Sequence, residues 1–331
     1  MLRPLVVIAN RNALHLRQKG PLLETLRGAR SRTVDLHETH SLEELRAVVA
    51  RIPSLRPRGV VFAGGDGTLM AGLTALAHVY GEAPLPDIAV APGGTVCTVG
   101  RNFGVRGNYA SYTHHLLQRL ARGTALPHVT RVLSVLEPGA PEGKGGGELP
   151  QPRLGFIFGF GLVSSFFERY YASGPRERLG LGVAARIVGR VFAESFFAGP
   201  VAREVLSPQA AEVTTDGETA PHEGYSLFVA SVLRDLGLHM HLTYRAQTRH
   251  DRFHVVASAL GPSALGPQLP RVLAGRALTG GGLDTLAQRV AVRFRAPAAA
   301  SRGRGYILDG ELFDAERVEV SIGPELTLRS V

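Results

Sequence analysis

The sequence has no tryptophan and a single cysteine, Cys97, in 331 residues. One cysteine cannot form an internal disulfide, which fits a reducing compartment. The apolar run near the N-terminus is too short for the core of a secretory signal. The longest apolar segment, residues 154–167, is too short to span a membrane and is interrupted by glycine and serine. We therefore expect a cytoplasmic protein.

Lysine is scarce as well. Only Lys19 and Lys144 are present, so arginine carries most of the net charge of +9. The sequence has no Cys/His finger, no RNP-like aromatic strand and no dense basic run, so we expect no nucleic-acid partner. The basic surplus fits either a solvated arginine-rich surface or contact with an anionic membrane or a phosphate group.

The N-terminal part alternates between strand-like and helix-like segments. Ser41 begins the first of these helices as the N-cap of a capping box. Such alternation predicts an α/β three-layer domain with a parallel sheet over residues 1–128. The strands are expected at 5–10, 59–63 and 87–92, and the helices at 41–52, 68–80 and 109–123.

A different pattern follows residue 128. Strand-like segments succeed one another, among them 203–207 and 238–246, and a helical stretch at 176–197 interrupts them. Residues 138–152 are rich in proline and glycine and predict a hairpin tip. We therefore expect a second, mainly antiparallel β domain over residues 129–331.

Two glycine-rich corners carry the chemistry. In GVVFAGGDGTLMAGL, residues 59–73, the glycines of GGDGT give the backbone the freedom to point N–H groups at an anion. The threonine that follows opens a helix, whose N-terminus favours phosphate. A second strand–glycine–helix corner spans residues 91–104. Because neighbouring parallel strands end at one edge of a sheet, the two corners are expected side by side, where ligands bind.

The acid inside the first corner needs its own explanation. Neither lysine lies in a Walker-type setting, so the charge of a phosphate must be neutralised in another way. Asp66 could bind Mg²⁺ directly or through water. The alternative is that Asp66-Gly67 forms only a tight turn. The position of GGDGT between a buried strand and a helix favours phosphate binding.

GGDGT followed by PGGT resembles the diacylglycerol kinase catalytic-domain family, which includes sphingosine kinases, ceramide kinases and bacterial soluble lipid kinases. The resemblance covers nearly the whole chain, from the opening strand LVVIAN through FGFGLVSSFFERY to the closing YILDGELFDAERVEVSIGPELTLRSV. GGDGT alone is shared with NAD kinases, and the closing DGE segment favours lipid kinases. The implied fold returns residues 305–331 to the cleft between the two domains.

The resemblance implies an ATP- and Mg²⁺-dependent lipid kinase with its nucleotide in that cleft. Glu311 would act as general base on the lipid hydroxyl, although Asp66 competes for this role. Asp66 and Asp309 would hold Mg²⁺ through water. The residues that would line the nucleotide are Asn10, Thr39, Gly64, Gly65, Asp66, Gly67, Thr68 and Thr95.

Several positions depart from the family pattern, the first being Arg11, where the family usually has proline after the asparagine. The family also usually carries Asn and Glu where this chain has Met70 and Ala71, and Asn-Asp where it has Cys97 and Thr98. A changed acceptor lipid or weakened catalysis would follow. The alternatives are a non-catalytic nucleotide- or lipid-binding relative and a kinase of a soluble acceptor. We expect Cys97 to be a small buried residue rather than a reactive thiol.

Two further groups could bind metal. Residues 248–256 resemble a structural Mg²⁺ loop of bacterial lipid kinases, with Asp251 as a ligand and His254 in place of the second acid. His239 and His241 alternate on the predicted strand 238–246 and would face one side of it. Because the sequence shows no third ligand for this pair, we expect a surface or cleft role for it.

The predicted helix at 181–192 has two interpretations. Its apolar stripe could pack on the core with a basic outer face exposed, or the helix could dock on anionic headgroups beside a lipid entrance. A membrane lipid is the expected substrate, reached by peripheral contact with the inner membrane. The sequence fixes neither the acceptor lipid nor the oligomeric state.

Overall fold

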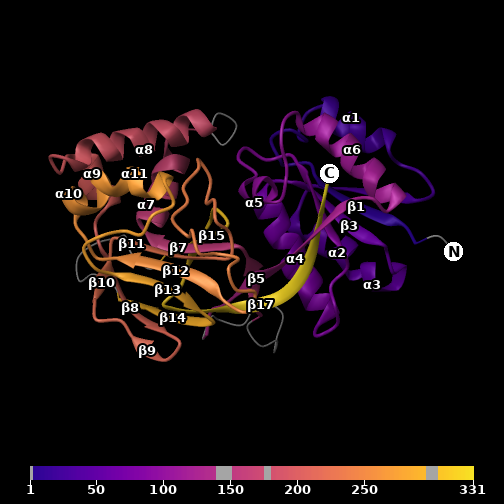
Figure 1. Cartoon of the computed structure of the whole chain (residues 1–331). Coiled ribbons are helices and arrows are strands. Elements are labelled where there is room, and N and C mark those ends of the chain that lie inside the picture. The colour runs from indigo at the N-terminus through magenta and orange to yellow at the C-terminus, as the bar shows by residue number, and fades with distance from the viewer. Residues whose placement is uncertain (1–2, 139–150, 175–179, 296–304) are drawn as a thin grey trace. The chain divides into compact units, whose positions relative to one another are not determined.

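The computed structural model describes residues 3–138, 151–174, 180–295 and 305–331 (Figure 1). The chain divides into two compact units, each with its own core. Unit 1 comprises Met1–Arg131 together with Pro324–Val331, and unit 2 comprises Val132–Gly323. Most of the predicted hairpin tip at 138–152 and the first residues of the predicted helix at 176–197 lie outside the described residues.

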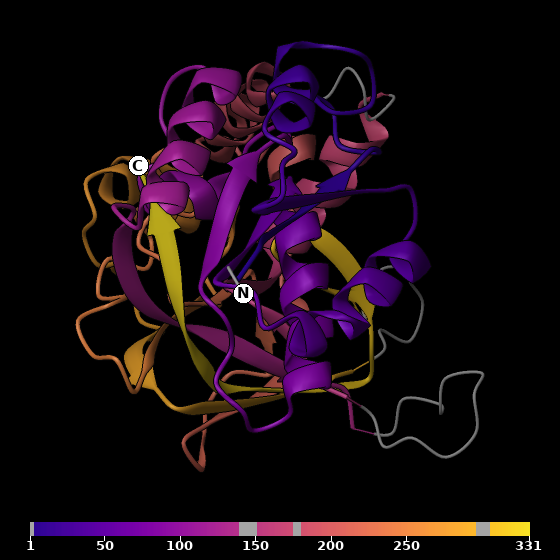
Figure 2. The same cartoon turned by 90° about the vertical axis from the view of Figure 1, so that its right-hand side faces the viewer.

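Unit 1 contains the predicted parallel sheet. Its strands lie in the order β4-β3-β1-β2, and the end of β17 pairs in parallel with β4 through Leu328 and Arg329 (Figure 2). The chain thus returns from its last segment to complete the first sheet. The strands are β1 (Leu5–Asn10), β2 (Val34–Thr39), β3 (Gly59–Gly64), β4 (Ile88–Pro92) and β17 (Arg317–Ser330).

Two helices of unit 1, α2 and α6, have the end signals that the sequence predicted, and α4 begins at Asp66 rather than at residue 68. Ser41 accepts a hydrogen bond from the backbone N–H of Glu44 at 3.1 Å and so caps α2. Gly123 ends α6 in the left-handed region, with φ of 71°. The helices are α1 (Pro21–Gly28), α2 (Leu42–Ala50), α3 (Ile52–Leu55), α4 (Asp66–Tyr80), α5 (Thr98–Asn102) and α6 (Tyr109–Arg122).

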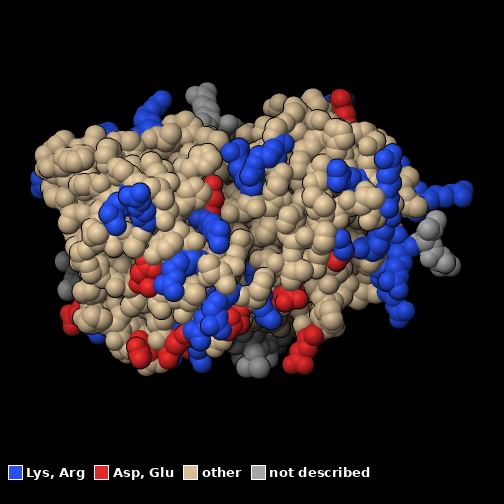
Figure 3. Space-filling view, in the orientation of Figure 1, with Lys and Arg blue, Asp and Glu red and all other residues tan. Residues whose placement is uncertain are grey.

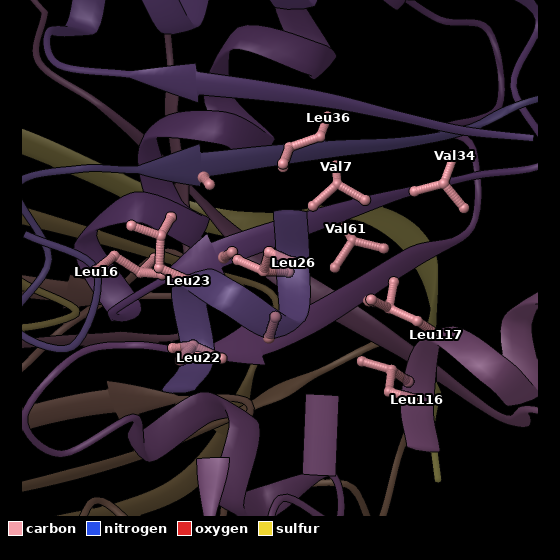
Figure 4. Packing of buried hydrophobic residues seen from close by; sticks show 14 of the residues in the cluster. Val7, Leu16, Leu22, Leu23, Leu26, Val34, Leu36, Val61, Leu116 and Leu117 are labelled. Atoms are coloured by element: carbon pink, nitrogen blue, oxygen red, sulfur yellow. The ribbon is translucent and has the colours of Figure 1, made fainter. Parts of the chain in front are cut away.

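Successive side chains of the buried strands point to opposite faces of this sheet. Val7 and Val61 pack against leucines of α1 and α6 in one core cluster (Figure 4). On the other face the ring of Phe62 lies so close to Gly72 of α4 that a Cβ there would clash with it. Helices therefore cover both faces, and the predicted three-layer α/β arrangement is confirmed.

Unit 2 contains the predicted antiparallel sheet. Six strands lie in the order β13-β12-β11-β7-β15-β16, and every neighbouring pair is antiparallel. Buried aromatic side chains, among them Phe158, Phe160 and Phe228, pack across its central strands. The strands are β7 (Ile157–Gly161), β11 (Leu227–Ser231), β12 (Phe253–Ser258), β13 (Leu283–Ala287), β15 (Gly305–Leu308) and β16 (Glu311–Asp314).

Further antiparallel strands of unit 2 pack against this sheet. Phe160 of β7 meets Phe294 of β14 edge to face, with ring centroids 5.2 Å apart. β14 pairs with β8 and with the first part of β17, and β6 pairs with β5. These strands are β5 (Leu126–Leu136), β6 (Arg153–Gly155), β8 (Gln209–Thr215), β9 (Glu218–Thr219), β10 (Gly224–Tyr225) and β14 (Arg289–Phe294).

The helices of unit 2 gather on one side of the six-stranded sheet (Figure 1). Sequence reasoning predicted only α8 among them, and Ala184 and Ile187 of its inner face are buried while Arg186 and Arg190 are exposed. The helices are α7 (Leu162–Ala172), α8 (Leu181–Ser195), α9 (Pro200–Val205), α10 (Pro262–Leu265) and α11 (Leu269–Leu273), with a 3₁₀ turn at Gly266–Gln268.

Two predicted strands are wrong. Residues 203–207 fall largely in α9, because Pro200 starts a helix that buries Val201, Ala202 and Val205. Residues 238–246 form turns, because positive φ angles at Gly237, Leu238 and His239 are incompatible with an extended strand.

Candidate functional site

The GGDGT corner joins β3 to α4 at the carboxyl edge of the parallel sheet. Gly65 is the N-cap of α4, and no side chain caps this helix. The first N–H groups of an α-helix have no acceptor within the helix, so the N-terminus of α4 offers several donors and the positive end of its dipole. This arrangement suits an anion.

The glycines of the corner are needed for close packing. Gly64, Gly65 and Gly67 all lack a positive φ, so the freedom expected from the sequence is not used. Instead, a Cβ on Gly94 would lie 2.5 Å from the Cα of Gly65, and a Cβ on Gly64 would overlap the side chain of Thr68. A side chain at Gly94 would force the two corners apart, and one at Gly64 would displace Thr68 within the first corner.

The second corner lies directly against the first, as predicted. β3 and β4 pair in register up to Gly64 and Pro92. The N–H groups of Gly93 and Gly94 then both donate to the carbonyl oxygen of Gly64, at 2.7 and 3.2 Å. The two glycine-rich turns therefore form one layer of closely packed backbone at the edge of the sheet.

Asp66 connects the two corners. Its Oδ2 accepts the N–H of Thr98 at 2.7 Å, and its Oδ1 accepts the N–H of Val99 at 3.0 Å. These are the first two residues of α5, so the carboxylate of one corner caps the helix of the other. Sequence reasoning missed this role because the partners lie more than 30 residues apart along the chain.

Two opposing influences act on the pKa of Asp66. Desolvation raises the pKa, because a charged carboxylate loses its hydration in this packed corner. The N–H groups of Thr98 and Val99 and the charge of Arg101 act in the opposite direction, and the net change is upward. A cation beside this carboxylate would favour its ionised form.

Other predicted nucleotide residues lie around the same edge. Asn10, the last residue of β1, donates from Nδ2 to the Oγ1 of buried Thr68 at 2.8 Å. Thr39 ends β2 opposite Asn10 and is buried. Thr95 is half-buried in the second corner. The strand ends thus bring these four residues to one side of unit 1.

An ion-pair cluster beside this edge holds the ends of β1 and β2. Arg27 donates from Nε and Nη2 to the two oxygens of Glu38, at 2.7 and 2.8 Å, and Arg11 binds the same carboxylate. The hydrogen bond from Arg27, followed by the one from Arg11, lowers the pKa of Glu38 to about 2 against the desolvation that opposes them. Glu38 lies within β2, a strand that was not predicted from the sequence.

Cys97 is buried, as predicted. It occupies the left-handed region with φ of 51° just before α5, and its thiol faces the carbonyl oxygen of Gly64. Burial, with a further contribution from the charge of Asp66, raises the pKa of Cys97 to about 12. The thiol is therefore protonated at neutral pH and serves as packing.

In unit 2, Asp309 and Gly310 form the two-residue turn between β15 and β16. Their φ angles of 48° and 89° are those of a type I′ hairpin turn. The carboxylate of Asp309 is buried and accepts the N–H groups of Phe156 and Ile157 at 2.9–3.0 Å. Asp309 therefore fastens the hairpin to the neighbouring segment at Phe156 and Ile157.

Glu311 is the first residue of β16 and is half-buried. The turn before it is held from outside, because Tyr171 of α7 donates its hydroxyl to the carbonyl oxygen of Gly310 at 2.6 Å. The ring of Phe167 packs against the same glycine. The backbone that carries Glu311 is thus fixed on both sides.

The first Asp-Gly-Glu triplet has the same local structure. Asp216 and Gly217 have φ angles of 48° and 92° and connect β8 to β9, as expected for a hairpin turn. The Asp216 carboxylate also accepts two backbone N–H groups, those of Gln288 and Arg289. Local geometry therefore does not distinguish the two copies.

Asp251, the predicted ligand of a structural metal, is paired with arginine. Arg249 binds its two oxygens at 3.1 and 3.2 Å, and this pairing lowers the pKa of Asp251. His254 is fully buried and contacts Asp284 at 2.9 Å rather than Asp251. The structure therefore does not bring Asp251 and His254 together as a pair of ligands.

Part of the chain that includes both glycine corners is similar to a known protein family. Residues 4–129 match the model of the diacylglycerol kinase catalytic domain. These residues belong to the diacylglycerol kinase catalytic-domain family. The match includes both glycine corners and therefore confirms the family predicted from them. No curated protein matches the chain.

Solved structures share the fold of this chain. A diacylglycerol kinase from Bacillus anthracis strain Sterne has a TM-score of 0.64 at 15% identity, with 99% of this chain and 97% of that one covered. A candidate diacylglycerol kinase of the same strain gives 0.65 at 16% identity, with 99% and 97% covered. At this identity the likeness shows the two-domain fold.

The surface of the protein carries basic side chains and exposed aromatic side chains. Among the described residues, every helix is too short or too polar to cross a bilayer. On the face shown in Figure 3, Lys and Arg side chains gather along the right-hand edge of unit 1. The largest exposed apolar side chains of unit 2 include Phe196 and Phe197, which follow α8 and are 61% and 69% exposed.

The Glu38 cluster gives a pH-dependent prediction. Because the pKa of Glu38 falls from 4.5 to about 2 on folding, its ion pairs stabilise the fold above pH 4.5 and lose this effect as the pH falls towards 2. Glu38→Gln should lower the free energy of unfolding at pH 7 by about 1–2 kcal/mol, after allowance for solvent screening. Urea unfolding of both proteins between pH 7 and 2 measures this difference.

The difference in the free energy of unfolding between the wild type and Glu38→Gln should narrow as the pH falls from 4.5 to 2. Glu82→Gln is the control, because Glu82 is exposed in a loop of the same unit and its loss should change stability by less than about 0.5 kcal/mol. A Glu38→Gln deficit of the same size at every pH would contradict the assignment.

Proposed function

We propose that this chain is an ATP- and Mg²⁺-dependent lipid kinase that transfers the γ-phosphate of ATP to a hydroxyl of a membrane lipid, such as diacylglycerol or a sphingoid base. The observation that carries the proposal is the pair of closely packed glycine corners at the uncapped N-terminus of α4. The match of residues 4–129 to the diacylglycerol kinase catalytic domain supports it.

The nucleotide phosphates bind at the GGDGT corner in this proposal. Gly65 and Gly67 carry no side chain and no side chain caps α4, so a phosphate can approach the backbone N–H groups at its N-terminus. Asn10 orients the Oγ1 of Thr68 through its hydrogen bond and has further acceptor capacity in its own Oδ1. Thr39 and Thr95 line the nucleotide beside them.

Asp66 and Asp309 are the carboxylates that we propose for Mg²⁺. Both already accept backbone N–H groups, which fix their orientation. A carboxylate oxygen has two lone pairs, so each group can still accept a hydrogen bond from water in the shell of a hard cation. When bound, Mg²⁺ would neutralise phosphate charge in a site without lysine.

Glu311 is the general base in this proposal. A half-buried carboxylate at the start of a strand, with its backbone held by Tyr171, can accept the proton of an acceptor hydroxyl without large movement. Phosphoryl transfer depends mainly on positioning and charge neutralisation, so an ordinary carboxylate is basic enough.

A non-catalytic relative is the second candidate function. Met70 and Cys97 are buried where the family usually has polar side chains, so neither provides a hydrogen-bonding group for a substrate. Ala71 likewise lacks the carboxylate usual at its position. Binding of a nucleotide or lipid without transfer would leave the glycine corners intact and still account for these losses.

Transfer of radiolabelled phosphate distinguishes these functions. The purified chain is incubated with labelled ATP, Mg²⁺ and a total lipid extract, and the organic phase is separated. The wild type should label a lipid, and Glu311→Ala should reduce labelling by about 10²–10⁴-fold, the usual loss on removal of a general base. Removal of Mg²⁺ with EDTA should abolish labelling.

The matched control is Glu218→Ala in the first Asp-Gly-Glu copy. Glu218 is exposed and follows the same kind of turn as Glu311, so this variant should retain wild-type labelling. Equal losses in both variants would reject Glu311 as the base. ATP binding by calorimetry without labelling of any lipid would favour the non-catalytic relative. Label that appears only in the aqueous phase, in a compound other than ATP, ADP or free phosphate, would favour a soluble acceptor.

We also propose that unit 2 touches an anionic membrane during catalysis. Phe196 and Phe197 are exposed at the end of α8, and Arg186 and Arg190 are exposed on the outer face of the same helix. Aromatic side chains can enter the headgroup region while arginines pair with anionic lipids. A kinase with a lipid acceptor needs such a surface.

Co-sedimentation with vesicles tests this contact. The wild type should bind vesicles that contain phosphatidylglycerol more tightly than neutral ones. A Phe196→Ser/Phe197→Ser double variant should bind at least about tenfold more weakly, because two exposed aromatic side chains no longer leave water. Leu126→Ser removes an exposed apolar side chain from β5 and should leave binding unchanged. Unchanged binding by the double variant would reject this surface.

A further inference from the structure

Three side chains with metal-binding groups converge in the connection between β11 and β12. In the part of the chain that the structure describes, one group of His, Cys, Asp or Glu side chains has the spacing of a metal site, namely Asp235, His239 and His241. One ligand atom from each lies within 4.8 Å of the others. The third ligand that the sequence did not reveal is Asp235, four residues before His239.

The backbone of this segment is closed by its own hydrogen bonds. The N–H of Leu236 donates to the carbonyl of Met240, and the N–H of Met240 donates to that of Gly237, both at 3.0 Å. Oδ1 of Asp235 accepts the N–H of Gly237 at 2.8 Å. The N–H of His241 is in turn bound to Val272. The ligand side chains therefore project from a fixed turn.

The turn adopts a conformation that side chains disfavour. Leu238 and His239 both have left-handed φ angles, 53° and 57°, next to Gly237 at 98°. The Cβ of a non-glycine residue is crowded against the backbone in this region. This conformation places His239 Nδ1 3.6 Å from Oδ2 of Asp235, and leaves the His239 side chain 87% exposed. A cation from solvent can reach the three ligands directly.

The donor types identify the class of metal. Two imidazole nitrogens and one carboxylate oxygen form the usual three-ligand set of an open zinc site, with water in the fourth position. Mg²⁺ prefers oxygen ligands throughout and would not select this group. The set is therefore chemically distinct from the carboxylates that we assign to the kinase reaction.

We propose that Asp235, His239 and His241 bind a divalent transition metal of the zinc type. The metal would fasten the turn between β11 and β12 in unit 2. This inference rests on the three ligands alone and is independent of the proposed kinase activity.

Calorimetry with zinc tests the site. The full chain is stripped with EDTA, exchanged into chelator-free buffer with excess Mg²⁺ and titrated with ZnCl₂. We expect one zinc per chain despite the Mg²⁺. His239→Ala and His241→Ala should each weaken zinc binding at least tenfold, because each removes one ligand. Zinc should also raise the melting temperature of the wild type but not that of the His239→Ala/His241→Ala double variant.

His222→Ala is the matched control, since His222 is another exposed histidine of unit 2. It should bind zinc as the wild type does. Equal melting temperatures of the variants and the wild type without zinc would show that the variants are folded. The proposal is overturned if the wild type binds no zinc. It is also overturned if the double variant still binds one zinc, or if His222→Ala weakens binding as much as His239→Ala does.

Discussion

The candidate nucleotide site depends on the contact between two glycine turns of unit 1. Gly94 lies against Gly65, with no space for a side chain at either corner, and two N–H groups of the second turn bind the carbonyl of Gly64. Asp66 adds a side-chain cap on α5 to this contact. One packed layer of backbone thus leaves the N-terminus of α4 uncovered, and every role that we propose for Asn10 and Thr68 depends on it.

Asp-Gly turns illustrate how one local structure can serve different purposes. Asp216 and Asp309 lie in hairpin turns with nearly equal φ angles, and both carboxylates bind two backbone N–H groups of a neighbouring segment. Their shared contribution is to fasten a hairpin. What differs is the surroundings: Asp309 is buried with Tyr171 holding its turn, whereas Asp216 pairs with Arg252 near the surface. Function can therefore be argued only from position in the fold.

Local signals made much of the fold predictable. The parallel sheet follows from short apolar runs separated by amphipathic helices, and Ser41 and Gly123 mark helix ends because their chemistry acts within one turn. The errors have tertiary causes. Residues 203–207 look like a strand until Pro200 and the buried face of α9 are considered. Left-handed φ angles occur at Leu238 and His239, which are residue types that rarely adopt them. The hydrogen bonds that Asp66 accepts from Thr98 and Val99 connect the turn after β3 to the helix after β4. No local sequence pattern predicts such a contact.

The central claim is that phosphate binds to backbone at the paired glycine corners. A crystal structure of the full chain with Mg²⁺ and a non-hydrolysable ATP analogue tests this claim most directly. The account predicts phosphate oxygens within hydrogen-bond distance of N–H groups of Gly65, Asp66 or Gly67, with Asn10 and Thr68 beside them. A nucleotide whose phosphates lie away from the N-terminus of α4, or point into solvent, would contradict it.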